Sequence, residues 1–302
     1  MSLRLNLLKY WIQRSTNKNH EKSIYELREE FTAAFNKHDT HPHVDTDISN
    51  HKSPDGIWYT PKKHIPHQII LYFHGGGMCF GGSDTHAHIV SEIAHQCQMR
   101  LFFLNYRLSP EFPFPKAIDD AFVAYKYLLS SGYEARHISI AADSSGGLLA
   151  LGLCYLIKEK GLEMPNILAL LSPATSTHIC FQDDLYRDWE RRDPVLNITL
   201  LRRYAVAYLA GEDARSPLCS PIYSDLKGYP PIFSVIGDND ILIEPLRQLH
   251  LNASTDGVIN RLFIQPDAFH GHYLWLKILP EAQEAIDTLC RFIMQQSLSS
   301  GR

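Results

Sequence analysis

The chain has 302 residues, 45% of them hydrophobic and 21% charged, so it can bury a large core and is neither disordered nor fibrous in composition. A net charge of -4, with the basic residues dispersed, argues against a nucleic-acid partner. The six cysteines show no CxxC spacing, and no signal peptide or apolar stretch of about 18 residues is evident, so we expect free thiols, no membrane span and a cytoplasmic location.

The first 40 residues contain two amphipathic patterns that predict helices. Apolar side chains recur at helical spacing on one face of each segment. In the first segment they are Leu5, Leu8, Trp11 and Ile12, and in the second Ile24, Leu27, Phe31, Ala34 and Phe35. So much apolar surface must be buried against another part of the protein. We expect residues 1–40 to form a helical cap; the alternative is that these helices pack elsewhere on the sheet and only stabilise it.

From residue 69 onward, short apolar runs alternate with segments of helical periodicity. The runs that predict strands are 69–73, 101–105, 138–142, 167–171, 232–236 and 261–265. They are apolar throughout, as expected for parallel strands that are covered on both faces. The segments that predict helices are 84–98, 116–131, 145–160, 244–255 and 281–296. This alternation indicates an α/β fold with a mostly parallel, doubly wound sheet.

Two stretches do not follow this alternation. Residues 174–230 include a predicted helix, "ITLLRRYAVAYLAG", and are too long for a simple connection, so we expect this insertion to cover an edge of the sheet. The stretch "DTHPHVDTD" at 39–47 is rich in histidine and aspartate. Its proline and its alternating pattern would spread the side chains to opposite faces, so it predicts a solvated loop or an edge strand and no metal site.

Polar residues with catalytic potential follow four of the predicted strands. In an open α/β sheet, the carboxyl ends of the strands form the ligand-binding edge. The sequences that follow these strands are "HGGG" at 74–77, "DSSGG" at 143–147, "GDND" at 237–240 and "FHGH" at 269–272. A serine, an acid and a histidine in this order, preceded by a glycine-rich turn, match the motif set of α/β-hydrolases.

The pattern predicts a catalytic triad. A serine hydroxyl becomes a good nucleophile when an imidazole takes its proton, and an acid must hold that imidazole in the right tautomer. We predict Ser144 as the nucleophile, Asp240 as the acid and His270 as the base. The residues that compete for these roles are Ser145, Asp238, Glu244 and His272. Ser145 would lie one residue into the following helix, with its hydroxyl pointing away.

Backbone amides beside the nucleophile are predicted to bind the negatively charged tetrahedral intermediate. Glycines allow the HGGG turn to direct its amides inward, and the amide of Ser145 lies at a helix start. We therefore predict an oxyanion hole formed by Gly75, Gly76 and Ser145. Next to this turn, Met78 and Phe80 are predicted to bind substrate by lining an acyl pocket. The alternative is that they only pack beneath the turn.

The chain resembles the hormone-sensitive-lipase-like carboxylesterases over most of its length. The sequences that carry the likeness include "YFHGGG", "NYRLSPEFPFPKAIDDA", "AADSSGG", "DPVLN" and "GDNDILIEP", and the combination of "YRLSPE" with the HGGG turn is the most specific part. The resemblance implies an α/β-hydrolase fold and the same roles for Ser144, Asp240 and His270. Three residues depart from the family pattern, namely Ala142 for glycine, Ser145 for alanine and Met78 for an aromatic residue.

These observations predict a serine carboxylesterase that acts on small, short-acyl esters through an acyl-enzyme intermediate, without metal or cofactor. We expect one α/β-hydrolase domain over residues 1–302, with cap segments at 1–40 and 174–230. The expected partner is a small-molecule ester, and the sequence leaves a homodimer open. Two alternative functions remain, an amidase or peptidase with the same triad and a non-catalytic small-molecule receptor. No long exposed apolar lid of the kind found in interfacial lipases is expected.

Overall fold

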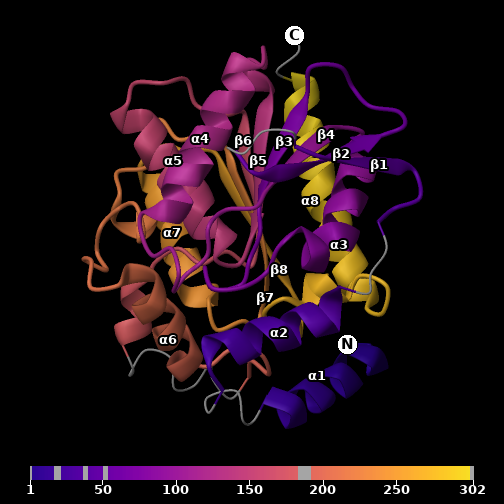
Figure 1. The fold of residues 1–302 in the computed structure, drawn as a ribbon, viewed down its shortest axis with the longest axis vertical. Helices are drawn as coiled ribbons and strands as arrows, with labels where there is room; N and C mark the ends of the chain where they lie inside the picture. The colour runs from indigo at the N-terminus through magenta and orange to yellow at the C-terminus, as the bar shows by residue number, and fades with distance from the viewer. Residues whose placement is uncertain (1, 17–21, 37–39, 50–53, 183–191, 300–302) are drawn as a thin grey trace.

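The computed structural model describes residues 2–16, 22–36, 40–49, 54–182 and 192–299 (Figure 1). Within these ranges, eight strands form one sheet in the order β1-β2-β4-β3-β5-β6-β7-β8. The strands are β1 (Val44–Ile48), β2 (Gly56–Pro61), β3 (Ile69–Phe73), β4 (Arg100–Leu104), β5 (Ile138–Asp143), β6 (Ile167–Leu171), β7 (Ile232–Gly237) and β8 (Asn260–Gln265). All neighbours from β4 to β8 are parallel, whereas β2 pairs antiparallel with both β1 and β4. The predicted mostly parallel sheet is confirmed.

The six predicted strands correspond to β3 through β8, with bounds that agree within one residue. Strands β3, β5 and β6 are buried along their whole length, which explains why their sequences are apolar throughout. The stretch 39–47 was expected to be a solvated loop or an edge strand. Residues 44–47 belong to the edge strand β1, residues 40–43 form a loop with a turn, and residue 39 lies outside the described residues. Strand β2 was not predicted. It begins with glycine and ends with proline, and only some of its residues are buried.

Five helices cover the two faces of the sheet at the predicted places. They are α3 (Ser83–Cys97), α4 (Lys116–Ser130), α5 (Gly146–Glu159), α7 (Ile243–Thr255) and α8 (Pro280–Ser299). Helices α3 and α8 lie on one face and α4, α5 and α7 on the other (Figure 1). One apolar core contains residues of α3 and α8, and a second contains residues of α4, α5 and α7. The sheet is therefore covered on both sides.

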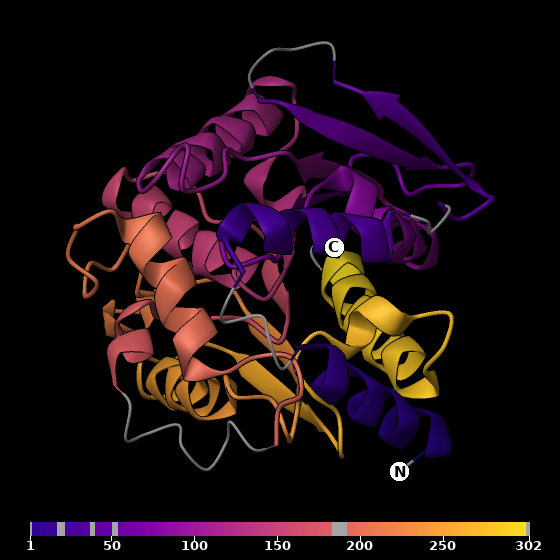
Figure 2. The ribbon, with the colours of Figure 1, turned by 60° about the horizontal axis from the view of Figure 1, so that its bottom comes forward.

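Three further helices lie at the lower end of the molecule in Figure 1, namely α1 (Leu3–Thr16), α2 (Ile24–Phe35) and α6 (Ile198–Leu209). Helix α2 begins with a capping box between Ser23 and Glu26. Helix α1 lies beside α8 (Figure 2), where its Leu5 and Ile12 are buried. The predicted burial of the apolar residues is incomplete, because Trp11 of α1 is 60% exposed.

Candidate active site

Ser144 lies at a sharp turn between β5 and α5. Its φ is 48°, a left-handed conformation that is unfavourable for a residue with a side chain. A Cβ atom at Gly146 would lie 2.2 Å from the carbonyl oxygen of Phe73, and one at Gly147 would lie 2.4 Å from Cβ of Pro173. The glycines that follow Ser144 are therefore required for the close packing of this turn.

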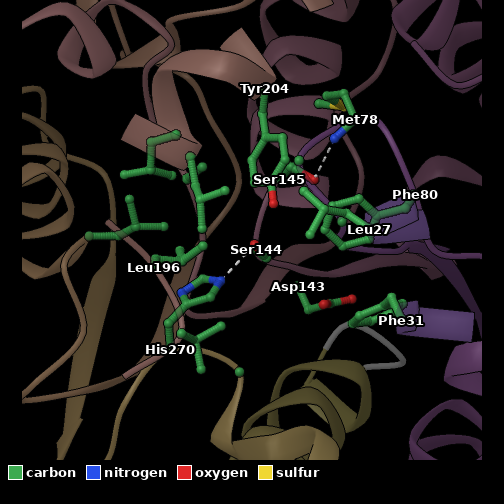
Figure 3. A pocket seen from close by; sticks show the side chains of 18 of the residues that line it. Leu27, Phe31, Met78, Phe80, Asp143, Ser144, Ser145, Leu196, Tyr204 and His270 are labelled. Atoms are coloured by element: carbon green, nitrogen blue, oxygen red, sulfur yellow. Dashed lines mark hydrogen bonds between the residues drawn. The ribbon is translucent and has the colours of Figure 1, made fainter. Parts of the chain in front are cut away.

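Ser144, His270 and Asp240 form a continuous hydrogen-bonded chain. The hydroxyl oxygen of Ser144 lies 2.8 Å from Nε2 of His270, as Figure 3 shows, and Nδ1 of His270 lies 3.0 Å from Oδ2 of Asp240. When Nδ1 donates to the carboxylate, Nε2 is left to accept the serine proton. Loops after β5, β7 and β8 bring these three side chains together.

The residues that compete for the acid and base roles make other contacts. Asp238 accepts a hydrogen bond from the side chain of Asn239, and Glu244 forms an ion pair with Arg247. The Nδ1 atom of His272 faces the carbonyl oxygen of Phe269 at 3.0 Å. Burial lowers the pKa of His272 to about 4. The structure thus brings Asp240 and His270, and neither Asp238 nor His272, into line with the serine.

Electrostatics at His270 favour the protonated ring. Burial alone lowers the pKa of His270, but the carboxylates of Asp240, Asp193 and Asp143 outweigh this effect and raise the pKa above its ordinary value of 6.5. A proton accepted from Ser144 is therefore stabilised on the imidazole. An imidazole that is already protonated cannot accept the serine proton. Proton transfer from Ser144 to His270 therefore requires a pH above this raised pKa.

Asp193 is a buried acid beside the triad that sequence reasoning did not assign to the site. Its Oδ2 accepts the amide of Ile241 at 3.1 Å, and its Oδ1 accepts the amides of Val195 and Leu196. Burial, together with the negative charge of Asp240, raises the pKa of Asp193 to about 6. Asp193 thereby connects the 174–230 insertion to the residue that follows Asp240. The sequence "DPVLN" is part of the family resemblance, but the sequence does not reveal that Asp193 contacts a residue 48 positions further along the chain.

The amides of the HGGG turn that are free to bind an oxyanion are not all the ones that were predicted. The amide of Gly75 donates to Oδ1 of Asp143 at 3.0 Å, so it is already engaged. Within the described ranges, the amides of Gly76, Gly77 and Ser145 donate to no acceptor, and all three residues line the pocket that contains Ser144. Gly76 and Gly77 have φ values of 114° and 61°, which favour glycine. Gly77 was not predicted as a site residue.

Asp143 lies at the centre of a buried hydrogen-bond network that contacts this turn. Its carboxylate accepts hydrogen bonds from the hydroxyls of Tyr72 and Tyr273, in addition to the amide of Gly75. The Nε2 atom of His86 lies 3.5 Å from its Oδ2. Burial alone would raise the pKa of Asp143, but His86 and the hydrogen bonds outweigh it and lower the pKa. Asp143 therefore fixes the position of the turn relative to Ser144.

The side chain of Ser145 also contacts the turn. Its hydroxyl oxygen accepts the amide of Met78 at 3.2 Å, so this hydroxyl is engaged with the HGGG turn, whereas the hydroxyl of Ser144 faces His270 (Figure 3). Met78 and Phe80 both line the pocket, as one of the two interpretations of these residues requires. Cys79 between them is buried in an apolar cluster with Leu27, and Phe80 packs against this cluster.

The pocket above Ser144 has a volume of about 390 Å³. Apart from the triad and its neighbours, its walls are mainly apolar. Helices α1, α2 and α6 contribute residues that include Trp11, Ile12, Leu27, Phe31, Leu200 and Tyr204. Within the described residues, no group of three or more His, Cys, Asp or Glu side chains could hold a metal ion. None of the described helices has the length and apolarity needed to cross a bilayer.

Comparison with known proteins agrees with this geometry. The model of a family described as having the alpha/beta hydrolase fold matches residues 70–274. The chain belongs to this α/β-hydrolase family. An acetyl-hydrolase of Streptomyces hygroscopicus is 31% identical over 236 residues, which is 78% of each chain. The crystal structure of an esterase/lipase from an uncultured bacterium is 29% identical with a TM-score of 0.93, and covers 99% of this chain and 100% of its own.

The resemblance to hormone-sensitive-lipase-like proteins is confirmed as well. An esterase from the bacterial hormone-sensitive lipase family is 28% identical to this α/β-hydrolase, with a TM-score of 0.91 over 98% of this chain and 99% of its own. The likeness extends over nearly the whole chain, beyond the 70–274 range of the family model.

Proposed function

We propose that the protein is a serine carboxylesterase for small, short-acyl esters, with Ser144 as nucleophile, His270 as base and Asp240 as acid. The protein is a serine hydrolase of the α/β-hydrolase family. The observation that carries the residue assignment is the 2.8 Å contact between the Ser144 hydroxyl and Nε2 of His270, in a chain that continues to Asp240. These are the atoms that nucleophilic acyl transfer requires.

In this mechanism the Ser144 oxygen attacks the ester carbonyl carbon while His270 takes the hydroxyl proton. The carbonyl oxygen becomes an oxyanion, and the amides of Gly76, Gly77 and Ser145 stabilise it. His270 then donates its proton to the departing alcohol, which leaves an acyl group on Ser144. A water molecule, deprotonated by His270, releases the acid and regenerates the serine. Gly77 replaces Gly75 in this proposal because the Gly75 amide already donates to Asp143.

The substrate class follows from the pocket. Its mainly apolar walls and volume of about 390 Å³ suit a small uncharged ester. The similar acetyl-hydrolase supports a short acyl group. Residues of α1, α2 and α6 line the pocket, which supports cap roles for residues 1–40 and 174–230; residues 1, 17–21, 37–39 and 183–191 lie outside the described residues. A cytoplasmic location is supported by the six cysteines, which are all buried and unpaired.

Hydrolysis of p-nitrophenyl acetate tests the proposal. Ser144→Ala should lower turnover by roughly 10⁴ to 10⁶, because the attacking oxygen is lost. Ser145→Ala is the matched control. It keeps the backbone amide and removes only the hydroxyl that accepts from Met78, so we expect a loss of less than about tenfold.

A small phosphonate, located by mass spectrometry, should label Ser144. Labelling of another residue, or the reverse ranking of the two variants, contradicts the assignment. Faster cleavage of a matched anilide than of the ester would favour an amidase. Tight binding of an ester without hydrolysis would favour a receptor.

A further inference from the structure

Helix α1 presents a continuous apolar stripe to solvent. Leu3, Leu7, Tyr10 and Trp11 are 74%, 62%, 57% and 60% exposed. They occupy positions i, i+4, i+7 and i+8, which lie on one face of a helix. We call these four residues the α1 stripe. Exposing large apolar side chains to water is unfavourable, and contiguous apolar patches of this kind mark interaction surfaces.

The stripe is not needed to hold α1 on the protein. The opposite face of the helix carries Leu5 and Ile12, which are buried in a cluster with Phe269, Leu279 and Ala282. The amide of Ser2 also donates to Glu281 of α8. The helix is thus anchored through one apolar face while a second apolar face remains exposed.

The charge of α1 indicates what kind of surface the stripe fits. The helix contains Arg4, Lys9 and Arg14 and no acidic residue, whereas the whole chain has a net charge of -4. Arg4 and Arg14 are exposed, and the Arg14 guanidinium lies 4.9 Å from the ring centroid of Tyr10. Lys9 lies on the inner side, where Asp267 and other carboxylates attract it. The exposed charged side chains of α1 are therefore positive.

We propose that α1 docks its stripe on an anionic lipid surface. Apolar and aromatic side chains flanked by arginine on a surface helix combine the two contributions that hold interfacial helices in a headgroup layer, apolar burial and attraction to anionic lipid. Trp11 of the stripe and the neighbouring Ile12 also line the pocket that contains Ser144. Docking would therefore place the pocket mouth at the lipid surface, where apolar esters concentrate.

This binding is separate from ester hydrolysis, so it is tested in a Ser144→Ala background. Sedimentation with phosphatidylcholine vesicles is compared with sedimentation with vesicles that contain roughly one third phosphatidylglycerol. We expect the protein to sediment with the anionic vesicles and to be released by salt. Arg4→Gln and Arg14→Gln should each weaken binding about fivefold.

Leu3→Ser/Leu7→Ser should weaken binding to the anionic vesicles by about tenfold or more, because apolar area is no longer buried. Leu251→Ser/Ile259→Ser is the matched control, since these residues are 60% and 71% exposed but lie away from α1. The control should bind like the parent, and thermal unfolding should show that both double variants are folded.

Three results overturn the proposal. The first is no binding to anionic vesicles, and the second is equal binding by Leu3→Ser/Leu7→Ser and its parent. The third is a dimer in sedimentation velocity that Leu3→Ser/Leu7→Ser abolishes, which would assign the stripe to a second copy of the chain. Because none of these measurements depends on turnover, failure of the esterase proposal would leave their interpretation intact.

Discussion

Asp240 uses both carboxylate oxygens, one to accept from Nδ1 of His270 and the other to accept the amide of Leu242. An asparagine here could donate to Nδ1 and so select the wrong imidazole tautomer. We expect Asp240→Asn to lower kcat/KM for p-nitrophenyl acetate by roughly 10⁴ at neutral pH. Asp238→Asn should change it little, because the His270 ring contacts the carboxylate of Asp240, whereas that of Asp238 accepts from the Asn239 side chain. A comparable loss in both variants would count against Asp240 as the acid.

Asp193 offers a pH test of the same site. Because the pKa of His270 is raised, the rate should fall as the pH decreases through that value. The negative charge of Asp193 contributes to the raised pKa, so Asp193→Asn should move the acid limb of the kcat/KM profile to lower pH. It should also lower kcat several-fold, since asparagine has one acceptor oxygen and cannot accept both the Ile241 amide and the amides of Val195 and Leu196.

Asp256→Asn is the control, because Asp256 also accepts a backbone amide, that of Leu226, but lies outside the site. Its profile should match the parent. A limb that stays in place in Asp193→Asn would show that Asp193 has a structural role only.

The site residues whose positions could be predicted are those that directly follow a recognisable strand in the sequence. Ser144, Asp240 and His270 each follow a strand, and parallel strands bring such positions to one edge of the sheet. The choice between Gly75 and Gly77 could not be predicted in this way. It depends on one hydrogen bond from the Gly75 amide to Asp143, and so on the rotation of a peptide group that the sequence does not reveal.

At the scale of elements, buried strands were easier to recognise than exposed ones. Strand β3 is apolar throughout because both of its faces are covered. Strand β2 is only partly buried and is stabilised by its pairing with β1 and β4. Helix α1 shows a related ambiguity. Its sequence has apolar residues on two opposite faces. The packing partners Phe269, Leu279 and Ala282, which are distant in the sequence, determine that Leu5 and Ile12 are the buried ones.

Removing residues 1–20 tests the contribution of α1 to the pocket. The truncation spares α2 but deletes Trp11 and Ile12 from the pocket wall. We expect the shortened protein to accept longer acyl chains relative to acetate, because the pocket is less closed. The ratio of kcat/KM for p-nitrophenyl octanoate and acetate measures this change, and reaction of Ser144 with a small phosphonate checks that the site is intact.

Deleting α1 also exposes the apolar cluster around Phe269, so the shortened chain is prone to aggregate. Ile12→Ala provides a second variant that keeps the helix, and it should shift the ratio in the same direction. Tyr25→Ala, at an exposed position of α2, serves as its control. An unchanged ratio in both the truncation and Ile12→Ala would mean that α1 does not shape the pocket.

At the scale of the whole molecule, ionisable groups that are buried in the fold act on its stability. His74 and His272 are both buried, and burial lowers their pKa values to about 3 and about 4. In the unfolded chain a histidine titrates near pH 6.5. Between these values the unfolded chain binds protons that the folded protein does not. The stability contributed by the neutral rings is therefore complete above about pH 6.5 and is lost as the pH falls.

For each of these histidines, the free energy of unfolding should decrease by about 1.4 kcal/mol for every pH unit below pH 6.5. Urea denaturation at about pH 7 and about pH 5.5 measures the change. We expect His272→Asn to make the change smaller by about 1 kcal/mol than in the parent, because one proton fewer is taken up on unfolding. Ile140→Val, at a buried position that does not titrate, should lower stability by about 1 kcal/mol at both pH values alike. If His272→Asn retained the full pH dependence of the parent, His272 would have to be protonated in the folded protein.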